Sequence, residues 1–557
     1  MRKVLQLCCL MLLIFKAGFS FSQIAPVTST DTFRIIQIIH ANNLREKTVD
    51  SVTKLEILTG DVRLNEGTTK FNCDSAVINQ KLNSMEAFGN VHINQGDSVF
   101  TSSQYIKYLG NERIAYLKKN VKLTDKKGTL LTNELEYDLK TGIGKYHNGG
   151  KVINGKTMLT STEGIYYEDT KDVYFINKVD VVDPKNKIKA DSLLYNMQTQ
   201  KLTFIGPTYI KNKDGNIFTT QGNYDLSNGN AFFGNRTLIK DSSGRTYQAN
   251  SMAMDEKSGI AQLEGNAIVK DSANSFILTG NEIYFGRKNN SMLATKKPVM
   301  IFWDKNDTTY ISGDTLFSGF TKRVYTEDII PQNDSIKTDS LKNILAKNDS
   351  SKFERVTKTK VINTDKTDTS IRYFLAYHHV KVFNDSLQSV SDSLFYSGAD
   401  STFRLFYDPV VWSGNSQVTG DTIYLFTKNK KAERIYVFEN GMLANKINAS
   451  YYNQVSGKTI NGYFKNGVID YIRAKGSPAE SVYYVQDKDS AFTGMNHADG
   501  SVIDMYFIKQ ELNKVKFLND VHGKLYPMHQ IPNDQKYLKN FNWLDKRRPK
   551  NKLELFE

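Results

Sequence analysis

The hexapeptide Ala190-Asp191-Ser192-Leu193-Leu194-Tyr195 is the clearest copy of a unit that recurs along the chain. The unit has a small residue, a polar pair, an apolar residue, any residue and an aromatic residue. Its fourth position recurs at Ala76, Ile106, Leu135, Ile165, Leu193, Gly222, Met252, Ile283, Leu316, Leu394, Ile423 and Tyr451. Consecutive copies are 28 to 33 residues apart, except for one gap of 78. One period of about 29 residues plus an insertion of about 49 explains that gap, which predicts a repeat protein with one interruption.

A second marker has the same period: a small or polar pair that leads into a β-branched or small apolar residue. Its copies are Gly60-Asp61-Val62, Gly89-Asn90-Val91, Lys119-Asn120-Val121, Gly150-Lys151-Val152, Asn177-Lys178-Val179 and Gly265-Asn266-Ala267. The two markers alternate, which predicts at least two strands in each period, separated by a turn. Gly-Asn and Gly-Asp pairs supply the positive φ that tight turns require, so we expect hairpin turns at these pairs.

The composition favours strands. Among 557 residues there are 30 Tyr, 31 Phe and only 10 Pro. Segments such as Lys201-Leu202-Thr203-Phe204-Ile205 alternate polar and apolar residues, which is typical of a strand with one buried face. We therefore predict an all-β chain, in which each unit packs on its neighbours.

The first 22 residues predict an export signal. Arg2 and Lys3 are followed by an apolar stretch, Val4 to Phe15, that is too short to span a bilayer comfortably. Removal of this segment leaves Cys73 as the one cysteine, so we expect no internal disulfide.

The chain is basic, with a formal net charge of +14, or +11 without Arg2, Lys3 and Lys16. Dispersed positive charge is typical of a solvated surface. It also suits an anionic partner such as a phosphorylated glycolipid or a membrane surface. Export makes nucleic acid an unsuitable partner, and the lysines do not form one cluster.

Composition and repeat spacing divide the chain into six parts. The expected parts are a signal peptide (1–22), a lead-in (23–52), a first array (53–320), a polar and disordered insertion (321–370), a second array (371–530) and a basic C-terminal tail (531–557). The lead-in contains an apolar stretch, Phe33 to Ile39, that could form a first strand. The tail carries Phe541-Asn542-Trp543, which predicts an exposed segment with an aromatic anchor that docks on its own domain or on a partner.

Alternate side chains of a strand lie on opposite faces, so the fourth and sixth positions of the unit share a face. Stacked units place these residues in one continuous apolar stripe. The stripe is either a closed core or the lining of a groove, and the residues alone favour the core.

One sequence motif imitates a nucleotide site. Gly150 to Thr157 matches the phosphate-loop pattern G-x-x-x-x-G-K-[ST]. That chemistry requires a helix directly after the lysine, whereas here another repeat strand is expected. We therefore interpret this match as chance.

Other signs of catalysis or metal binding are weak. The adjacent His378 and His379 would point to opposite faces of a strand, so we expect surface or turn histidines. Asp304-Lys305-Asn306-Asp307 lacks the remaining spacing of a calcium loop. The aspartates at the second position of the unit are interpreted as turn caps, because a catalytic centre needs only one copy; they are Asp74, Asp191, Asp314, Asp392 and Asp421. We predict no enzyme, no metal site and no cofactor.

Taken together, the export signal, the unit Ala190 to Tyr195 and the alternating Gly89-Asn90-Val91 marker resemble the OstA-like (organic solvent tolerance), or LptA-like, family of lipopolysaccharide transport proteins. The resemblance covers residues 53–320 and 371–452, and extends more weakly to about 530. It implies an elongated antiparallel β-jelly-roll, or β-taco, in which two sheets form a V around an apolar interior. The chain has more units than the short periplasmic members, and it lacks the later strands that a large barrel would need.

The resemblance implies a lipid-binding bridge that carries lipopolysaccharide, through its lipid A acyl chains, across the periplasm toward the outer membrane. Its implied partners are inner-membrane and outer-membrane transport components, joined by head-to-tail pairing of sheet edges. The implied location is the periplasm, with or without association with the outer membrane. The candidate lumen residues are Ile106, Tyr108, Leu135, Tyr137, Ile165, Leu193, Tyr195, Met252, Met254 and Ile283.

Two other functions remain open at this point. One is a structural or adhesive β-solenoid with a packed interior that binds protein or carbohydrate on its outer face. The other is a polysaccharide-processing β-helix enzyme, which the missing cluster of carboxylates or histidines disfavours.

Overall fold

The structure is a computed structural model that describes residues 35–556 apart from 51–52, 304–306, 322–370, 429–430, 466, 488, 490 and 510. The described chain is almost entirely strand, which confirms the all-β prediction. The predicted signal peptide and almost all of the predicted polar insertion lie outside the described residues.

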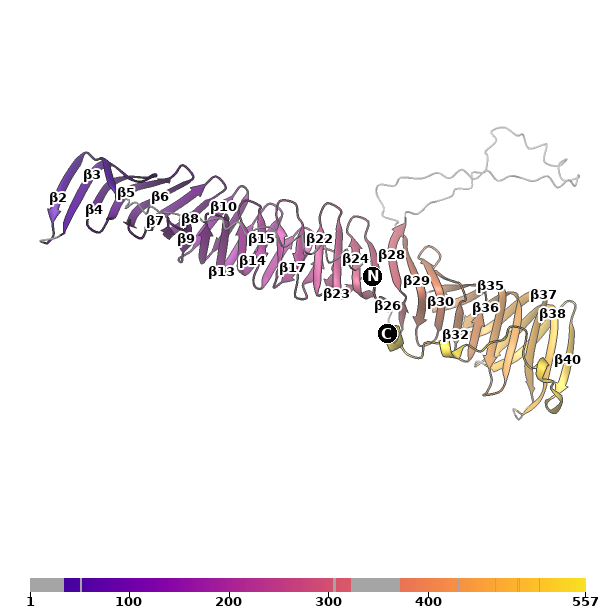
Figure 1. Cartoon of the computed structure of the whole chain (residues 1–557). Helices are drawn as coiled ribbons and strands as arrows, with labels where there is room; N and C mark the ends of the chain where they lie inside the picture. The colour runs from indigo at the N-terminus through magenta and orange to yellow at the C-terminus, as the bar shows by residue number, and fades with distance from the viewer. Residues whose placement is uncertain are drawn as a thin grey trace, which may run out of the picture. The chain divides into compact units, whose positions relative to one another are not determined.

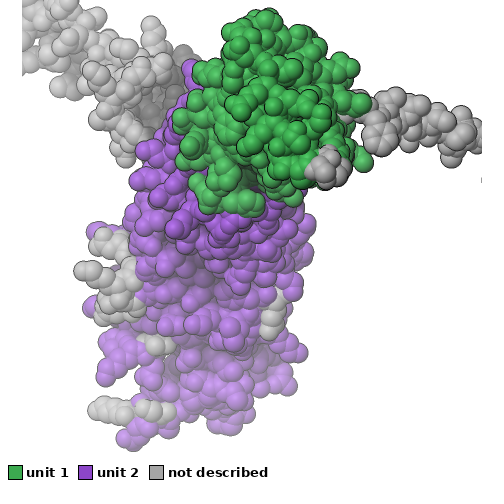
Figure 2. All heavy atoms as spheres, turned by 90° about the vertical axis from the view of Figure 1, so that its left-hand side faces the viewer, with its two compact units in different colours: residues 1–148 green, residues 149–557 purple. Residues whose placement is uncertain are grey.

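The chain forms two compact units, residues 1–148 and residues 149–557, which Figure 2 colours separately. The first unit contains β1 (Gln37–His40), β2 (Asn43–Thr48), β3 (Lys54–Glu66), β4 (Thr69–Asn79), β5 (Ser84–Gln95), β6 (Val99–Leu109), β7 (Ile114–Asp125), β8 (Thr129–Asp138) and β9 (Ile143–Tyr146). The strand β1 overlaps Phe33 to Ile39, the apolar stretch of the lead-in that could form a first strand.

The second unit begins with shorter strands. These are β10 (Gly150–Asn154), β11 (Thr157–Ser161), β12 (Glu163–Tyr167), β13 (Asp172–Val182), β14 (Asn186–Asn196), β15 (Lys201–Phe204), β16 (Thr208–Asn212), β17 (Gly215–Thr219), β18 (Gly222–Asp225), β19 (Ala231–Phe233), β20 (Leu238–Asp241), β21 (Thr246–Gln248), β22 (Ser251–Asp255), β23 (Ile260–Asp271), β24 (Phe276–Gly286), β25 (Ser291–Thr295), β26 (Val299–Trp303), β27 (Thr308–Ser312) and β28 (Thr315–Thr321).

It continues beyond the insertion with both short and long strands, the longest of which is β37. These are β29 (Ile371–Phe383), β30 (Gln388–Ser397), β31 (Thr402–Phe406), β32 (Val410–Ser413), β33 (Ser416–Thr419), β34 (Thr422–Lys428), β35 (Lys431–Lys446), β36 (Tyr452–Lys465), β37 (Val468–Gln486), β38 (Phe492–Ile508), β39 (Glu511–Leu518) and β40 (His522–Pro527). Short 3-10 turns follow at η2 (Met528–Gln530), η3 (Asn533–Gln535), η4 (Asp545–Arg547) and η5 (Lys552–Leu555).

Each long strand belongs to two sheets. In β14, residues Asn186 to Ala190 pair with β16, whereas Leu193 to Asn196 pair with β15. The described pairings are antiparallel, and the strands of each unit stand side by side as rungs (Figure 1). The two halves of a strand therefore contribute to two sheets that enclose an interior, which is the arrangement expected of a jelly-roll.

The paired markers form corners inside long strands. Gly89 and Asn90 have φ of 71° and 44°, as the sequence predicted, but they lie in the middle of β5. The pairing register with β4 shifts at this point, which is the property of a β-bulge. The prediction of hairpin turns at these pairs is therefore wrong. Positive φ is also needed where a single strand bends and continues from one sheet into the other.

Each corner packs against the neighbouring strand. Asn90 Nδ2 donates a hydrogen bond of 3.0 Å to Asp74 Oδ2. A Cβ added to Gly89 would lie 2.3 Å from the same oxygen, so this position requires glycine for space as well as for φ.

The recurring aspartates occupy these corners. Asp421 accepts hydrogen bonds from Asn440 Nδ2 at 3.1 Å, in the same arrangement as Asp74 with Asn90. Other corners pair Glu134 with Asn148, Gln221 with Asn235, Asp314 with His379, and Asp392 with His378. These aspartates do cap bends of the chain, as interpreted, but the bends are the corners inside long strands and not hairpin turns. The Asp191 carboxylate accepts a long hydrogen bond of 3.4 Å from the neighbouring Ser192 hydroxyl, and the Asp191 N–H donates to the Pro207 carbonyl at 3.2 Å.

Alternation buries one face of each strand. In β6 the buried residues include Val99, Thr101, Ser103, Ile106 and Tyr108, and the remaining side chains are more exposed. Cys73 belongs to this buried set in β4, and its burial raises the thiol pKa to about 12. Because the thiolate is the reactive form, we expect this cysteine to be inert in the folded chain.

The corner contact yields a stability prediction. Gly89→Ala places a Cβ against Asp74, whereas Gly96→Ala, at φ 54°, meets no atom within 4 Å. Both variants pay the positive-φ penalty of about 1 kcal/mol, and we expect Gly89→Ala to lose at least ~1 kcal/mol more. Urea unfolding followed by circular dichroism measures the difference. Equal losses in the two variants would show that the packing of Asp74 on the corner contributes nothing.

Candidate functional site

Most of the predicted lumen residues are buried between the sheets. The fully or almost fully buried members are Ile106, Tyr108, Leu135, Tyr137, Leu193, Tyr195, Met252 and Ile283. Ile165 and Met254 are half-buried. The apolar columns predicted from the repeat therefore do face the interior in most units.

One unit has a different register. In β12 the buried residues are Gly164 and Tyr166, while Ile165 lies on the opposite face of the strand. The prediction that Ile165 occupies the inner column is wrong by one residue. The unit at this point reads Glu163-Gly164-Ile165-Tyr166-Tyr167, and its small glycine hid the inner position from a search for apolar residues.

Close packing fills much of the interior. Phe71 and Tyr108 lie 5.3 Å apart between ring centroids in the first unit, and Phe204 and Phe233 lie 6.3 Å apart in the second. Leu193 is wholly without exposed surface. At these rungs the apolar stripe is a closed core.

The interior opens into a cavity of about 330 Å³ in the second unit. Its apolar wall includes Ile217, Tyr224, Leu263 and Phe285, together with two of the predicted lumen residues, Met252 and Met254. Methionine side chains adapt to irregular apolar ligands. We name this space cavity 1.

The rim of cavity 1 comes from two rows of hairpins. The first row contains Lys185, Lys213 and Asp214, and the second contains Glu256 and Arg287. Because the rows end opposite sheets, they form the two lips of a mouth. The basic side chains at these lips provide charge for an anionic group above the apolar wall.

An ion pair spans this mouth. Arg287 donates to Asp214 Oδ2 of the opposite lip at 2.7 Å and to Glu256 Oε2 of its own lip at 2.7 Å. The Arg287 side chain is 23% exposed and that of Asp214 is 50% exposed. We call the contacts of Arg287 with Asp214 and Glu256 the Arg287 clasp. Ion pairs this exposed contribute about 0–1 kcal/mol to stability, so the clasp can open at a small cost in free energy.

Other rungs are closed by similar links between the sheets. Asn154 Nδ2 donates to the Met197 carbonyl at 2.6 Å. In the first unit the Tyr108 hydroxyl donates to Glu66, and burial together with this carboxylate raises the pKa of Tyr108. The mouth of cavity 1 differs from these rungs because its link between the sheets, the ion pair of Arg287 with Asp214, lies at the surface.

A buried ion pair lies behind the wall of cavity 1, where Arg245 donates to the hydroxyl of the lining residue Tyr247 at 3.3 Å. Arg245 and Asp271 approach to 3.2 Å, with side chains 7% and 6% exposed. Burial works against the charge of Asp271, but hydrogen bonds from Asn274 and the charge of Arg245 lower its pKa overall. Arg245 also donates to Asn290 Oδ1 at 2.7 Å, which ties the two sheets together beyond Phe285.

A second cavity, of about 590 Å³, is lined by strands from both sides of the insertion. The wall of this cavity 2 is formed by apolar residues that include Phe302, Phe374, Leu394, Phe403, Leu405 and Leu425. One lip is the hairpin from Asn384 to Leu387, and the other includes Ser401 and Lys431. None of these residues was among the predicted lumen set. The repeat did carry the signal, because Leu394 is a fourth-position residue.

The structure also tests the other motifs. The segment that imitates a phosphate loop is the hairpin of β10 and β11, with no helix after Lys156, so no nucleotide cradle forms. His378 and His379 are exposed at the corner of β29, as predicted for turn histidines. Among the described residues no three His, Cys, Asp or Glu side chains group as metal ligands. Most of the segment Asp304 to Asp307 is outside the described part.

The described part of the chain also has no helix that is long and apolar enough to cross a membrane.

Comparison with known proteins gives a family match for the first part of the chain. Residues 34–191 match the model of the family described as OstA-like protein, which confirms the resemblance read from the repeat. A solved structure, the periplasmic lipopolysaccharide transport component LptH from Pseudomonas aeruginosa, is similar at 15% identity, covers 30% of this chain and 80% of LptH, and has a TM-score of 0.09. No curated protein matches the chain significantly.

The Arg287 clasp gives a kinetic prediction. Arg287→Gln removes the link across the mouth, so an apolar fluorophore should enter cavity 1 about three- to five-fold faster, as expected for the loss of roughly 1 kcal/mol. Stopped-flow fluorescence measures entry, and 1 M salt should accelerate entry into the unaltered protein in the same way. Arg236→Gln, at an exposed corner, is the matched control. An unchanged entry rate in Arg287→Gln would contradict the role of the clasp.

Proposed function

We propose, with the OstA-like character of residues 34–191 as the premise, that this protein is a non-enzymatic carrier of lipopolysaccharide. In this proposal it bridges the periplasm toward the outer membrane and holds acyl chains between its two sheets. The family match supports lipopolysaccharide transport in general terms. The site itself is proposed from the geometry of the cavities.

Cavity 1 is the observation that carries the proposal. Its wall is apolar, as acyl chains require, and the transfer of each CH₂ group from water into such a wall is favourable by about 0.8 kcal/mol. Its lips carry Lys185, Lys213 and Arg287, which suit the phosphates of lipid A. A ligand with several acyl chains and a phosphorylated head matches both features at once.

Sheet edges provide the proposed means of assembly. The strand β2 is exposed along its whole length and pairs only with β3 among the described strands. Toward the other end of the described chain, β39 pairs with β38 alone among the described strands. Open edges are sites where another strand can add through main-chain hydrogen bonds, so each edge is proposed to accept a transport partner.

A second candidate function rests on a different surface. An aromatic and arginine row crosses the outer face of β30, β31 and β34, where Phe395, Arg404 and Tyr424 pair directly. The Arg404 guanidinium lies 5.4 Å from the Phe395 ring centroid and 5.1 Å from that of Tyr424. Half-exposed rings of this kind can stack on sugars, as an adhesive solenoid that binds carbohydrate would require.

Lipid binding by cavity variants tests the proposal. The double variant Met252→Asp with Met254→Asp places two carboxylates in the apolar wall of cavity 1. We expect the purified variant to bind fluorescent lipopolysaccharide at least about ten-fold more weakly than the unaltered protein does. Tyr209→Asp with Phe232→Asp is the control, since these side chains are 61% and 45% exposed. Circular dichroism checks that each variant folds.

Two results would oppose the lipid site. Undiminished affinity in the folded methionine variant would remove cavity 1 from the account. Full competition by polysaccharide that lacks lipid A would favour the carbohydrate-binding candidate, because that competitor has no acyl chain to place between the sheets.

A further inference from the structure

The C-terminal segment packs on the outer face of a sheet in its own unit. In Figure 1 this segment, in yellow, runs back from β40 toward β28. Its path is fixed by contacts with residues far away in sequence, such as Leu544 with Gln417 and Arg547 with Asp408. The segment docks on its own unit, one of the two alternatives stated for the C-terminal tail, and its Leu538 and Leu555 are buried.

Two glutamines hold the main chain of the segment in the same way. Gln454 Nε2 donates to the Lys536 carbonyl at 3.0 Å, and the Leu538 N–H donates to Gln454 Oε1 at 2.9 Å. Gln417 repeats the pattern six residues later, with the Asn542 carbonyl and the Leu544 N–H, both at 2.7 Å.

The glutamines belong to one row across the sheet. Gln388 pairs with Trp412, Trp412 with Gln417, Gln417 with Ala444, and Ala444 with Gln454. Gln388 accepts from the Arg548 guanidinium at 2.8 Å, so the row meets the segment at three places. The three glutamines are between 0% and 5% exposed. A buried amide without partners is costly, and the segment supplies these partners.

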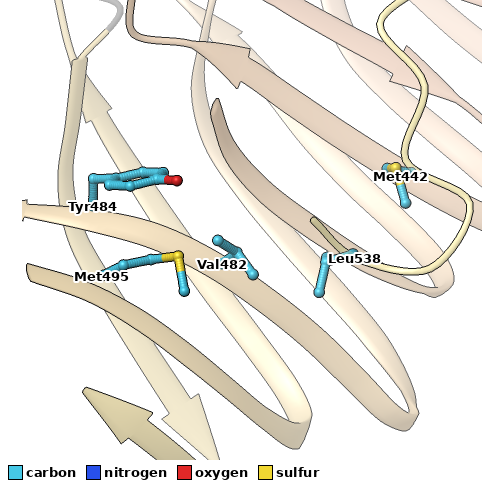
Figure 3. Close-up of a cluster of buried hydrophobic side chains, with 5 residues drawn as sticks. All are labelled: Met442, Val482, Tyr484, Met495 and Leu538. Atoms are coloured by element: carbon cyan, nitrogen blue, oxygen red, sulfur yellow. The ribbon is translucent and has the colours of Figure 1, made fainter. Parts of the chain in front are cut away.

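Apolar sockets alternate with the glutamines. Leu538 packs with Met442, Val482 and Met495 (Figure 3). Leu544 packs on Val390, Val410 and Trp412.

The row also selects the shape of its ligand. Two strand spacings, roughly 10 Å, separate Gln454 from Gln417, whereas six fully extended residues would span about 20 Å. The segment therefore needs the turn in which the Phe541 N–H donates to the Leu538 carbonyl at 3.0 Å. The Phe541 ring stacks on the Tyr537 ring, with 4.8 Å between the centroids, and its centroid lies 5.2 Å from that of Tyr452. These ring contacts support the turn.

We propose that this sheet face is a peptide-binding groove whose ligand is the chain's own C-terminal segment, residues 536–548. The groove recognises a turned peptide by two main-chain clamps at Gln454 and Gln417, two leucine sockets and the Arg548 contact with Gln388. Recognition of this kind does not require that the segment be joined to the rest of the chain through residue 535. The same segment, supplied as a separate peptide, therefore fits the groove.

Cleavage of the folded chain tests this proposal. A protease site is placed between the exposed residues Asn533 and Asp534, and the intact protein is cut after folding. We expect the freed segment to co-elute with the body at micromolar concentration, to dissociate on dilution, and to be replaced saturably by a labelled peptide of residues 535–556. Gln417→Ala with Gln454→Ala in the body should weaken peptide binding at least ten-fold.

The peptide itself supplies matched controls. Leu538→Asp with Leu544→Asp should abolish binding, whereas Lys539→Ala, at an exposed position, should bind as the natural sequence does. A folded body that fails to bind the peptide, or glutamine variants that bind it undiminished, would overturn the proposal.

A measurement on the uncut chain covers the case in which the cut body unfolds. The proposal predicts that hydrogen exchange at the Leu538 and Leu544 amides accelerates at least ten-fold in the glutamine variants. Unchanged protection at both amides would overturn it.

Discussion

The bend that carries one strand from one sheet to the other is the constraint on which the rest of this structure depends. A flat strand would leave the apolar column of each repeat facing water. Paired residues with positive φ, such as Gly89 and Asn90, let the strand turn while its hydrogen bonds continue on both sides of the bulge. The corner carboxylates and amides then fix one rung on the next. The facing sheets, the closed core and the mouth between the lips all follow from this bend.

The interior that results is uneven, and the unevenness suggests function. Where large aromatic rings meet, as at Phe204 and Phe233, the space between the sheets is filled. Where methionine and alanine replace them, as at Met252 and Ala261, a cavity remains. The buried pair of Arg245 and Asp271 supports the wall of this cavity through the lining residue Tyr247, and removing one partner of such a pair is costly. We therefore regard the cavities as bounded compartments in a largely packed array.

Much of this could be predicted from the sequence, for physical reasons. Period-2 alternation reveals strands and which of their residues are buried, as Ile106 and Leu193 are. Positive φ does not reveal whether a pair makes a hairpin or a bulge, since both need the same conformation. The Ile165 register failed because Gly164 has no side chain to mark its face. The positions of the cavities depend on the distance between the sheets, which the sequence pattern does not contain. Gln417 and Gln454 have no feature in the sequence that distinguishes them from surface residues, because the segment that covers them is far away in the chain.

The most direct test of the central claim is photo-crosslinking in the native envelope from a benzophenone amino acid at Met254, which lines cavity 1. The account predicts lipopolysaccharide adducts from Met254 and none from the outward-facing Tyr209. Adducts from Tyr209 with none from Met254 would contradict it, because the ligand would then lie on the outer face and the space between the sheets would play no part.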